Sequence, residues 1–154
     1  MRKQKLKSIL HKLAYEIQTQ TENEIIYNKI DNETGIIHII KVIDKSYFCQ
    51  YIGINENHPL AGIQYYCFPF EVDCHGGLTF SGNGKDFYQK LPPGYWYYGW
   101  DYAHFGDYTK LNPSGKKWTL LEVLEEGKKV LKQFKKYYRI NFCDTCLKIL
   151  KRLK

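Results

Sequence analysis

The hydrophobic residues of this 154-residue chain follow a strand-like pattern through its middle and a helical pattern towards its ends. Six central segments have the length and the β-branched or aromatic content of strands: Ile25–Ile30, Ile36–Ile43, Tyr47–Ile54, Tyr66–Cys74, Gly77–Ser81 and Tyr95–Tyr102. Turn residues at Asp31–Gly35 and Asp44–Ser46 separate the first three segments. These three segments therefore predict an antiparallel meander.

The clearest helical pattern begins after Thr119. Thr119 and Glu122 have the spacing of a capping box, and Trp118 is placed to pack onto Val123. Six residues share one side of the predicted helix: Leu120, Val123, Leu124, Gly127, Leu131 and Phe134. Because Gly127 has no side chain, we expect the helix to approach a sheet closely at this residue.

Residues 3–18 and 141–154 show helical spacing as well, and both segments are basic. The economical fold is α+β, an antiparallel sheet of about five or six strands with N- and C-terminal helices packed on it. We expect a single domain over residues 1–154 that has three parts: a core at 24–136 and basic helical extensions at 1–20 and 138–154.

The net charge of +7 conceals an asymmetry along the chain. Residues 1–13 and 128–154 carry 15 Lys/Arg and one acid, whereas residues 14–127 carry eight Lys/Arg and 15 Asp/Glu. A uniformly basic nucleic-acid-binding domain is therefore not indicated. The basic ends could contact nucleic acid, an acidic protein or an anionic membrane; alternatively, they dock on the acidic central part or stay solvated.

Two other classes of protein are not indicated. No apolar run approaches the ~20 residues that span a bilayer, and the basic N-terminus is not followed by the apolar segment of a secretory signal. The five cysteines are an odd number, which favours reduced thiols over a disulfide framework. We therefore expect a cytoplasmic protein.

Two adjacent glycines, Gly76 and Gly77, stand where the fifth strand-like segment begins. Such glycines usually mark a bulge or a close approach to the backbone. His75 precedes them, and strand alternation places Thr79 and Ser81 on one face unless the glycines shift the register. The segment therefore predicts a site with an imidazole and two hydroxyls; the alternative is a bulged edge strand with ordinary hydrogen bonds.

Asp101 lies near the end of the aromatic sixth segment, and His104 and Asp107 follow it at intervals of three residues. On a helical turn this spacing places all three side chains on one side. Such a set could bind a metal, orient a histidine as general base or bind ribose hydroxyls; the alternative is an Asp-capped turn with Asp–His hydrogen bonding. Antiparallel pairing of Gly77–Ser81 with Tyr95–Tyr102 would bring both sets to one end of the sheet.

The candidate site residues form two groups. The catalytic candidates, which are also the candidate ligands of a divalent metal, are His75, Asp101, His104 and Asp107. The ligand-binding candidates are His58, Gly76, Gly77, Thr79, Ser81, Trp100 and Tyr102. Gly82–Gly94, a Gly- and Pro-containing segment, is predicted to be a long loop beside them. His11 and His38 receive no role.

The cysteines offer weaker chemistry. Cys143 and Cys146 form a CxxC motif, but no second cysteine pair or suitably spaced histidines follow to complete a zinc site. A thioredoxin-like role would need the motif to open a helix in a βαβ unit, and that context is missing. Cys74 beside His75 is a further candidate nucleophile.

Four segments resemble a family of small, largely uncharacterised proteins of phages and bacterial prophages: Cys49–Gly53, His58–Gly62, His75–Gly82 and Trp96–Asp107, followed by the capped helix. The resemblance covers roughly residues 36–134, and HGGLTFSG and DYAHFGD are its specific parts. This chain departs from the family's pattern at three positions: Gln50 for Gly, Trp100 for Phe and Tyr102 for Cys. The resemblance implies a phage-type accessory protein in the host cytosol.

Three functions agree with these features. The first is binding, and sequestering, a small phosphorylated nucleotide-like molecule, as the glycines, hydroxyls, imidazoles and aromatic residues suggest; the resemblance to phage proteins implies a role in counter-defence. The second is metal-dependent hydrolysis of a nucleotide or phosphoester by His75, Asp101, His104 and Asp107. The third is inhibition of a protein or DNA partner through the basic terminal helices. We expect the first.

Overall fold

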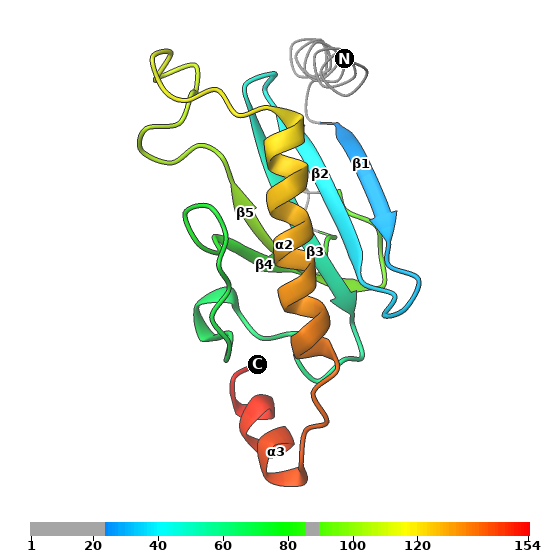
Figure 1. The fold of residues 1–154 in the computed structure, drawn as a ribbon. Coiled ribbons are helices and arrows are strands. Elements are labelled where there is room, and N and C mark those ends of the chain that lie inside the picture. Colours follow the sequence, from blue (N-terminus) through cyan, green and yellow to red (C-terminus); the bar gives the residue numbers. More distant parts are fainter. Residues whose placement is uncertain (1–23, 86–89) are drawn as a thin grey trace.

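The computed structural model describes residues 24–85 and 90–154, so the predicted helix over residues 3–18 lies outside the described part. Three strands, β1 (Ile25–Ile30), β2 (Ile37–Ile43) and β3 (Tyr47–Asn55), pair antiparallel in chain order. Figure 1 shows them side by side, in blue to teal. The predicted meander is confirmed.

Two further strands complete the sheet. β4 (Phe80–Gly82) is at the edge, and β5 (Tyr95–Asp101) lies between β3 and β4, so the strand order is β1-β2-β3-β5-β4. Every neighbouring pair is antiparallel. The five-stranded sheet and its helices confirm the α+β class.

The predicted strand over Tyr66–Cys74 is wrong. The chain forms a 3₁₀ turn, η1 (Tyr65–Cys67), and then runs beside the long helix instead of joining the sheet. Its backbone pairs with a helix side chain: the Asp73 N–H donates to Gln133 Oε1 (2.8 Å), and Gln133 Nε2 donates to the Asp73 carbonyl (2.9 Å). An apolar segment satisfied in this way needs no partner strand.

Helix α2 (Leu120–Tyr138) begins as predicted. The Thr119 side chain accepts from the Glu122 N–H, while the Glu122 carboxylate accepts from the Thr119 N–H (2.8 Å), so the capping box is confirmed. Val123, Gly127 and the rest of the predicted apolar side face the sheet. Figure 1 shows α2 lying along one face of the sheet.

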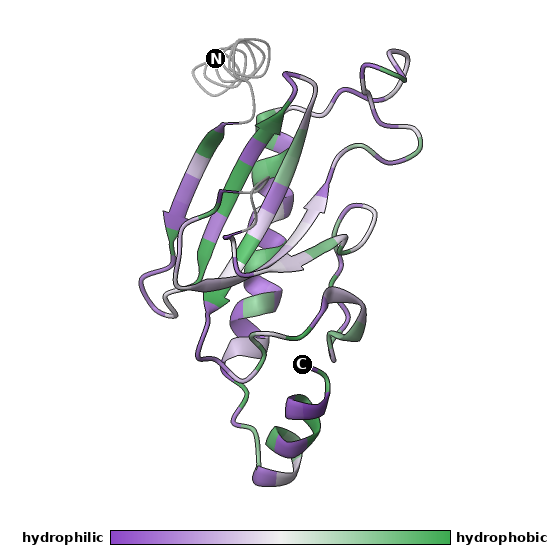
Figure 2. Ribbon diagram, turned by 180° about the vertical axis from the view of Figure 1, so that it is seen from behind, coloured by the Kyte–Doolittle hydropathy of each residue, from purple (hydrophilic) through white to green (hydrophobic). Residues whose placement is uncertain are grey.

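The two faces of the sheet bury separate clusters. The larger lies under α2 and includes Ile40, Ile52 and Val130. The smaller lies on the opposite face, where Leu91 packs against Ile39, Tyr51 and their neighbours. Figure 2 shows this second face of the sheet. Strand β2 is therefore buried on both faces, which explains why five of its seven residues are isoleucine or valine.

Basic residues near the C-terminal end of α2 pair with acidic residues of the turn between β1 and β2. Lys135 of α2 lies 2.8 Å from Asp31 and 3.0 Å from Glu33, and Arg139 lies 2.7 Å from Glu33. The charge asymmetry is thus partly neutralised between α2 and the β1–β2 turn. Binding of nucleic acid or an acidic protein by the basic ends stays a prediction.

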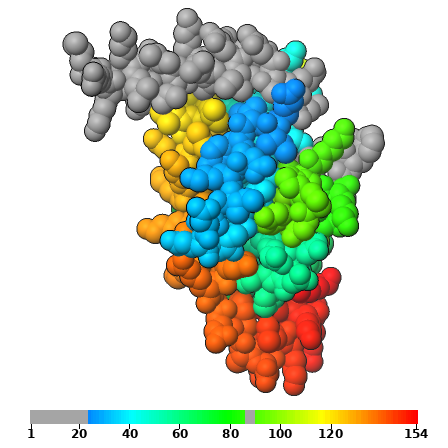
Figure 3. Space-filling model, turned by 90° about the vertical axis from the view of Figure 1, so that its right-hand side faces the viewer, coloured from blue at the N-terminus to red at the C-terminus, as the bar shows by residue number. Residues whose placement is uncertain are grey.

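Helix α3 (Asp144–Arg152) confirms the helix expected over residues 141–154. Its buried Leu150 belongs to the same cluster as Leu60 and Ile63, and Lys154 lies beside Gly62. Figure 3 shows α3, in red, at the lower end of the molecule next to this teal segment. Within residues 24–85 and 90–154, no helix is long and apolar enough to cross a membrane.

Candidate functional site

His75 and Asp107, from the two segments singled out in the sequence, contact each other directly. His75 Nε2 lies 2.7 Å from Asp107 Oδ2. A carboxylate accepts and does not donate, so Nε2 carries a proton, and in the neutral ring Nδ1 is the acceptor. The imidazole stacks on Tyr102, with ring centroids 5.0 Å apart and an interplanar angle of 7°. The ring is therefore held in one orientation.

Asp107 is buried, and both of its carboxylate oxygens accept hydrogen bonds. Oδ2 also accepts from the His104 N–H (2.9 Å), and Oδ1 accepts from the Trp118 indole N–H (2.8 Å). Burial by itself raises the pKa of the Asp107 carboxyl, but the hydrogen bonds from Trp118 and His75 outweigh burial and leave the pKa below its usual value. Asp107 thus stays ionised and orients His75.

A chain of hydrogen bonds runs from the interior towards this pair. His38 Nε2 donates to Gln50 Oε1 (2.6 Å), and Gln50 Nε2 donates to the Tyr102 hydroxyl (2.7 Å). Tyr102 in turn donates to Glu126 Oε2, and the other oxygen of Glu126 accepts from the His75 N–H (2.6 Å). His38, Gln50 and Tyr102 each donate to the next group, and the chain ends at Glu126, which accepts from both Tyr102 and the His75 N–H and so fixes the backbone at His75.

Gly76 explains why the first segment needs glycine. Its φ is +67°, and a Cβ at this position would overlap the His104 imidazole. His104 thus lies directly on the Gly76 backbone, and its Nε2 is buried with no hydrogen-bond partner. The nearest carboxylate atom, Asp101 Oδ1, is 3.8 Å away. The predicted close approach to these glycines is made by His104.

Asp101, His104 and Asp107 do not lie on a helical turn, the arrangement in which their spacing would place all three side chains on one side. The segment is an irregular turn in which Asp101 Oδ1 accepts from the Ala103 N–H (3.0 Å). As a result the two carboxylates diverge: Asp107 points to His75 and Trp118, whereas Asp101 Oδ2 accepts from the Thr79 hydroxyl (3.0 Å). Among the described residues, no group of three or more His, Cys, Asp or Glu is arranged to hold a metal ion.

An open depression adjoins Asp101 on the sheet face opposite α2. Its volume is about 290 Å³. It is lined by a carboxylate, hydroxyls and aromatic rings, from Tyr47, Cys49, Tyr51, Thr79, Phe80, Trp100 and Asp101. Tyr51 and Phe80 form an edge-to-face pair with centroids 5.6 Å apart. The depression offers a hydrogen-bond acceptor beside π faces.

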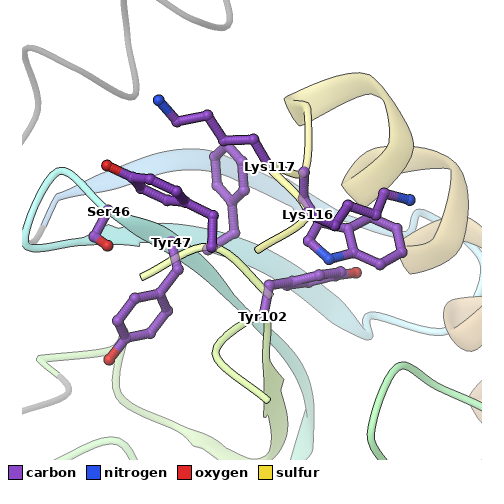
Figure 4. Close-up of a pocket in the computed structure, with 8 residues that line it drawn as sticks. Ser46, Tyr47, Tyr102, Lys116 and Lys117 are labelled. Carbon is purple, nitrogen blue, oxygen red and sulfur yellow. The ribbon is translucent and has the colours of Figure 1, made fainter. Parts of the chain in front are cut away.

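A second cleft lies on the other side of Tyr102, between Ser46–Phe48 and Lys116–Trp118. Figure 4 shows its lining residues, with the side chains of Lys116 and Lys117 extending in opposite directions. Lys116 Nζ lies 3.4 Å from the centroid of a Trp118 ring. The cleft is too narrow to admit a water-sized molecule. A ligand therefore has room beside Asp101 rather than here.

Not all candidates join this group. His58 stacks on Tyr138, with centroids 4.1 Å apart, and its Nε2 lies 3.1 Å from the Tyr138 carbonyl. Ser81 donates to Gln64 Oε1 (2.9 Å), so it contacts a partner different from that of Thr79. Gly77 has a φ of +80° and open space around it.

Trp100 and Tyr102 are largely buried under α2, although Trp100 also lines the depression. Trp100 Nε1 donates to Glu126 Oε2 (3.3 Å), the same oxygen that Tyr102 contacts. Gln50 also bonds to Tyr102. Gln50, Trp100 and Tyr102 are thus connected to one another through Tyr102 and Glu126.

Sequence reasoning missed Glu126, Gln50 and His38. Glu126 stands three residues after Val123 on the apolar side of α2, and an acid at such a position signals a buried partner. His38 lies among the isoleucines of β2, and its burial there is the reason it needs Gln50 as a hydrogen-bond partner. Burial raises the pKa of the Cys74 thiol to about 12, which argues against Cys74 as a nucleophile.

The chain was compared with models of protein families, with curated proteins and with solved structures, and none of the three comparisons finds a match. The resemblance to phage and prophage proteins stays a prediction.

Proposed function

We propose that this protein is a phage-type accessory protein that binds, and sequesters, a small phosphorylated nucleoside-like ligand in the depression beside Asp101. The observation that carries the proposal is the meeting of the two motif segments at this depression, where Thr79 donates to Asp101. Its volume of about 290 Å³ is near the lower end of ligand pockets.

The lining suits a sugar and a base. The Asp101 carboxylate is part-exposed, and it accepts hydrogen bonds from the ligand's hydroxyls as it does from Thr79. The part-exposed Phe80 ring, which lines the depression, offers a stacking surface for a nucleobase.

Lys41 lies in the row of cross-strand neighbours that contains Asp101. Lys41 is opposite Cys49 across β2 and β3, and Cys49 is opposite Asp101 across β3 and β5. Burial lowers the pKa of the Lys41 ammonium. A phosphate near this row would favour the charged form of the lysine and gain an attractive interaction in a poorly solvated place.

Calorimetric titration of the full chain with ADP-ribose and with 3′,5′-cyclic AMP tests the proposal. Asp101→Ala should weaken binding by roughly 10- to 100-fold, the equivalent of ~1.5–3 kcal/mol for hydrogen bonds to a charged group. Glu56→Ala is the control and should bind like the wild type, because this exposed acid follows the end of β3 that is remote from Asp101. Failure of the wild type to bind either nucleotide, or an Asp101→Ala affinity equal to that of the wild type, would contradict the proposal.

One observation favours hydrolysis as a second candidate function. Asp107 holds His75 Nε2, and His75 Nδ1 makes no hydrogen bond to any residue in the part of the chain that the structure describes. A histidine oriented by a carboxylate in this way is suited to act as a general base. Mass spectrometry of the same nucleotides after incubation distinguishes the two functions, since sequestration returns them intact. Turnover that His75→Gln abolishes supports hydrolysis, and EDTA sensitivity would assign the step to a divalent metal.

A further inference from the structure

The CxxC motif that the sequence left without a role opens a helix. Cys143 is the N-cap of α3, and its Sγ accepts from the Cys146 N–H (3.5 Å). The two sulfurs lie 3.2 Å apart, and both residues are exposed. The element directly before the motif is helix α2 and not a strand, so the βαβ context is missing, but the local arrangement of a dithiol at a helix N-terminus is present.

The two sulfurs have different surroundings. Hydrogen bonds from the Cys146 N–H and thiol lower the pKa of the Cys143 thiol, and the same contact raises the pKa of Cys146. Elsewhere in the chain, burial raises the pKa of both Cys49 and Cys74 to about 12. Cys143 is therefore suited to attack a disulfide first, and Cys146 is suited to resolve the mixed disulfide that forms.

We propose that Cys143 and Cys146 form a thiol–disulfide exchange site that reacts reversibly with a low-molecular-weight disulfide of the glutathione type. The proposal is independent of the ligand site: α3 follows the C-terminal end of α2, whereas the chain after β5, the strand that ends at Asp101, leads to the other end of that helix (Figure 1). The 3.2 Å between the sulfurs lets the second step occur with little movement of the chain.

The exchange has two steps. The Cys143 thiolate attacks one sulfur of the disulfide, the S–S bond breaks, and one thiolate leaves and takes up a proton. Cys146 loses its proton to solvent and attacks the Cys143 sulfur, which breaks the mixed disulfide and releases the second thiol. Two protein thiols are oxidised to one disulfide, and one small disulfide is reduced to two thiols.

The test uses the reduced full chain mixed with oxidised glutathione at pH 7, then quenched with acid and mapped by peptide mass spectrometry. We expect the wild type to lose about 2 Da at a Cys143–Cys146 disulfide, because the mixed disulfide resolves. Cys146→Ser should instead accumulate glutathione on Cys143. Cys143→Ser, in which serine still caps the helix, should react far more slowly at Cys146.

A second measurement separates reactivity from mere exposure. In Cys146→Ser, alkylation of Cys143 by iodoacetamide should be faster in the folded protein than in urea, because unfolding removes the helix N-terminus. Equal alkylation rates in the two states, or wild-type protein that retains glutathione as a mixed disulfide, would overturn the proposal.

Discussion

Gly127 of α2 lies where the helix is closest to the sheet, and Gly127→Ala tests how tightly this contact is packed. A Cβ at residue 127 would come within 3.0 Å of the Gln50 amide oxygen and of the His38 ring. Gln50 cannot move aside freely, because its fully buried amide bonds to His38, to Tyr102 and to the Val123 carbonyl (2.6, 2.7 and 2.8 Å). The substitution must therefore displace either the helix or this network.

Three effects set the expected magnitude. Alanine is favoured over glycine in a helix by about 1 kcal/mol. Against this, overpacking costs roughly 1–3 kcal/mol, and each buried hydrogen bond of Gln50 left unmade costs about 1–3 kcal/mol. With one such bond lost, we expect Gly127→Ala to lower the free energy of unfolding by about 1–5 kcal/mol, centred near 3 kcal/mol.

Urea unfolding followed by circular dichroism measures this loss. With a slope of about 2 kcal/mol/M, 3 kcal/mol moves the midpoint by roughly 1.5 M. Glu125→Ala, at an exposed position of the same helix, is the control and should stay within about 0.5 kcal/mol of the wild type.

A double-mutant cycle identifies the cause. Gln50→Ala removes the amide that the new methyl group meets, so the double variant should be more stable than the two single losses predict, by about 1 kcal/mol or more. A Gly127→Ala protein as stable as the wild type, or strict additivity with Gln50→Ala, would refute the reasoning.

Three further predictions concern single residues. Gly76→Ala should lower the free energy of unfolding by about 1–3 kcal/mol from backbone strain, and by more because the new methyl group displaces His104. Gly77→Ala is the control, since Gly77 also has a positive φ but has open space around it. Equal losses of unfolding free energy in the two variants would contradict the contact between Gly76 and His104. Thr119→Ala removes half of the capping box and should cost about 1 kcal/mol in the same assay. Burial lowers the pKa of His38 from its usual 6.5, so the unfolded chain binds protons more readily below about pH 6.5. The free energy of unfolding should therefore fall from pH 7.5 to pH 5.5, and less steeply in His38→Gln; equal slopes would contradict this account.

Local signals in the sequence were sufficient for much of the fold. The turn residues at Asp31–Gly35 and the capping pair Thr119–Glu122 form hydrogen bonds with neighbours a few residues away. Their structure can therefore be predicted without the rest of the chain. The predicted strand over Tyr66–Cys74 failed because its apolar residues pack on α2, and an apolar run does not state which partner covers it.

The candidate site divides in the same way. The sequence by itself determined that the segments around His75 and Asp107 carry the polar residues. It also indicated that Gly76 and Gly77 mark a bulge or a close approach to the backbone. Only the tertiary structure decided that Asp107 turns to His75 and Trp118 while Asp101 turns to Thr79, and that Glu126 and Gln50 join the network.

The physical reason is the range of the interactions. A turn, a cap or a positive φ depends on neighbours in the chain, and residue identity reports it. A hydrogen bond between Gln50 and Tyr102 spans 52 residues and forms only when a helix excludes water from both. Its partners are chosen by the packing of α2 on the sheet, which no short stretch of sequence specifies.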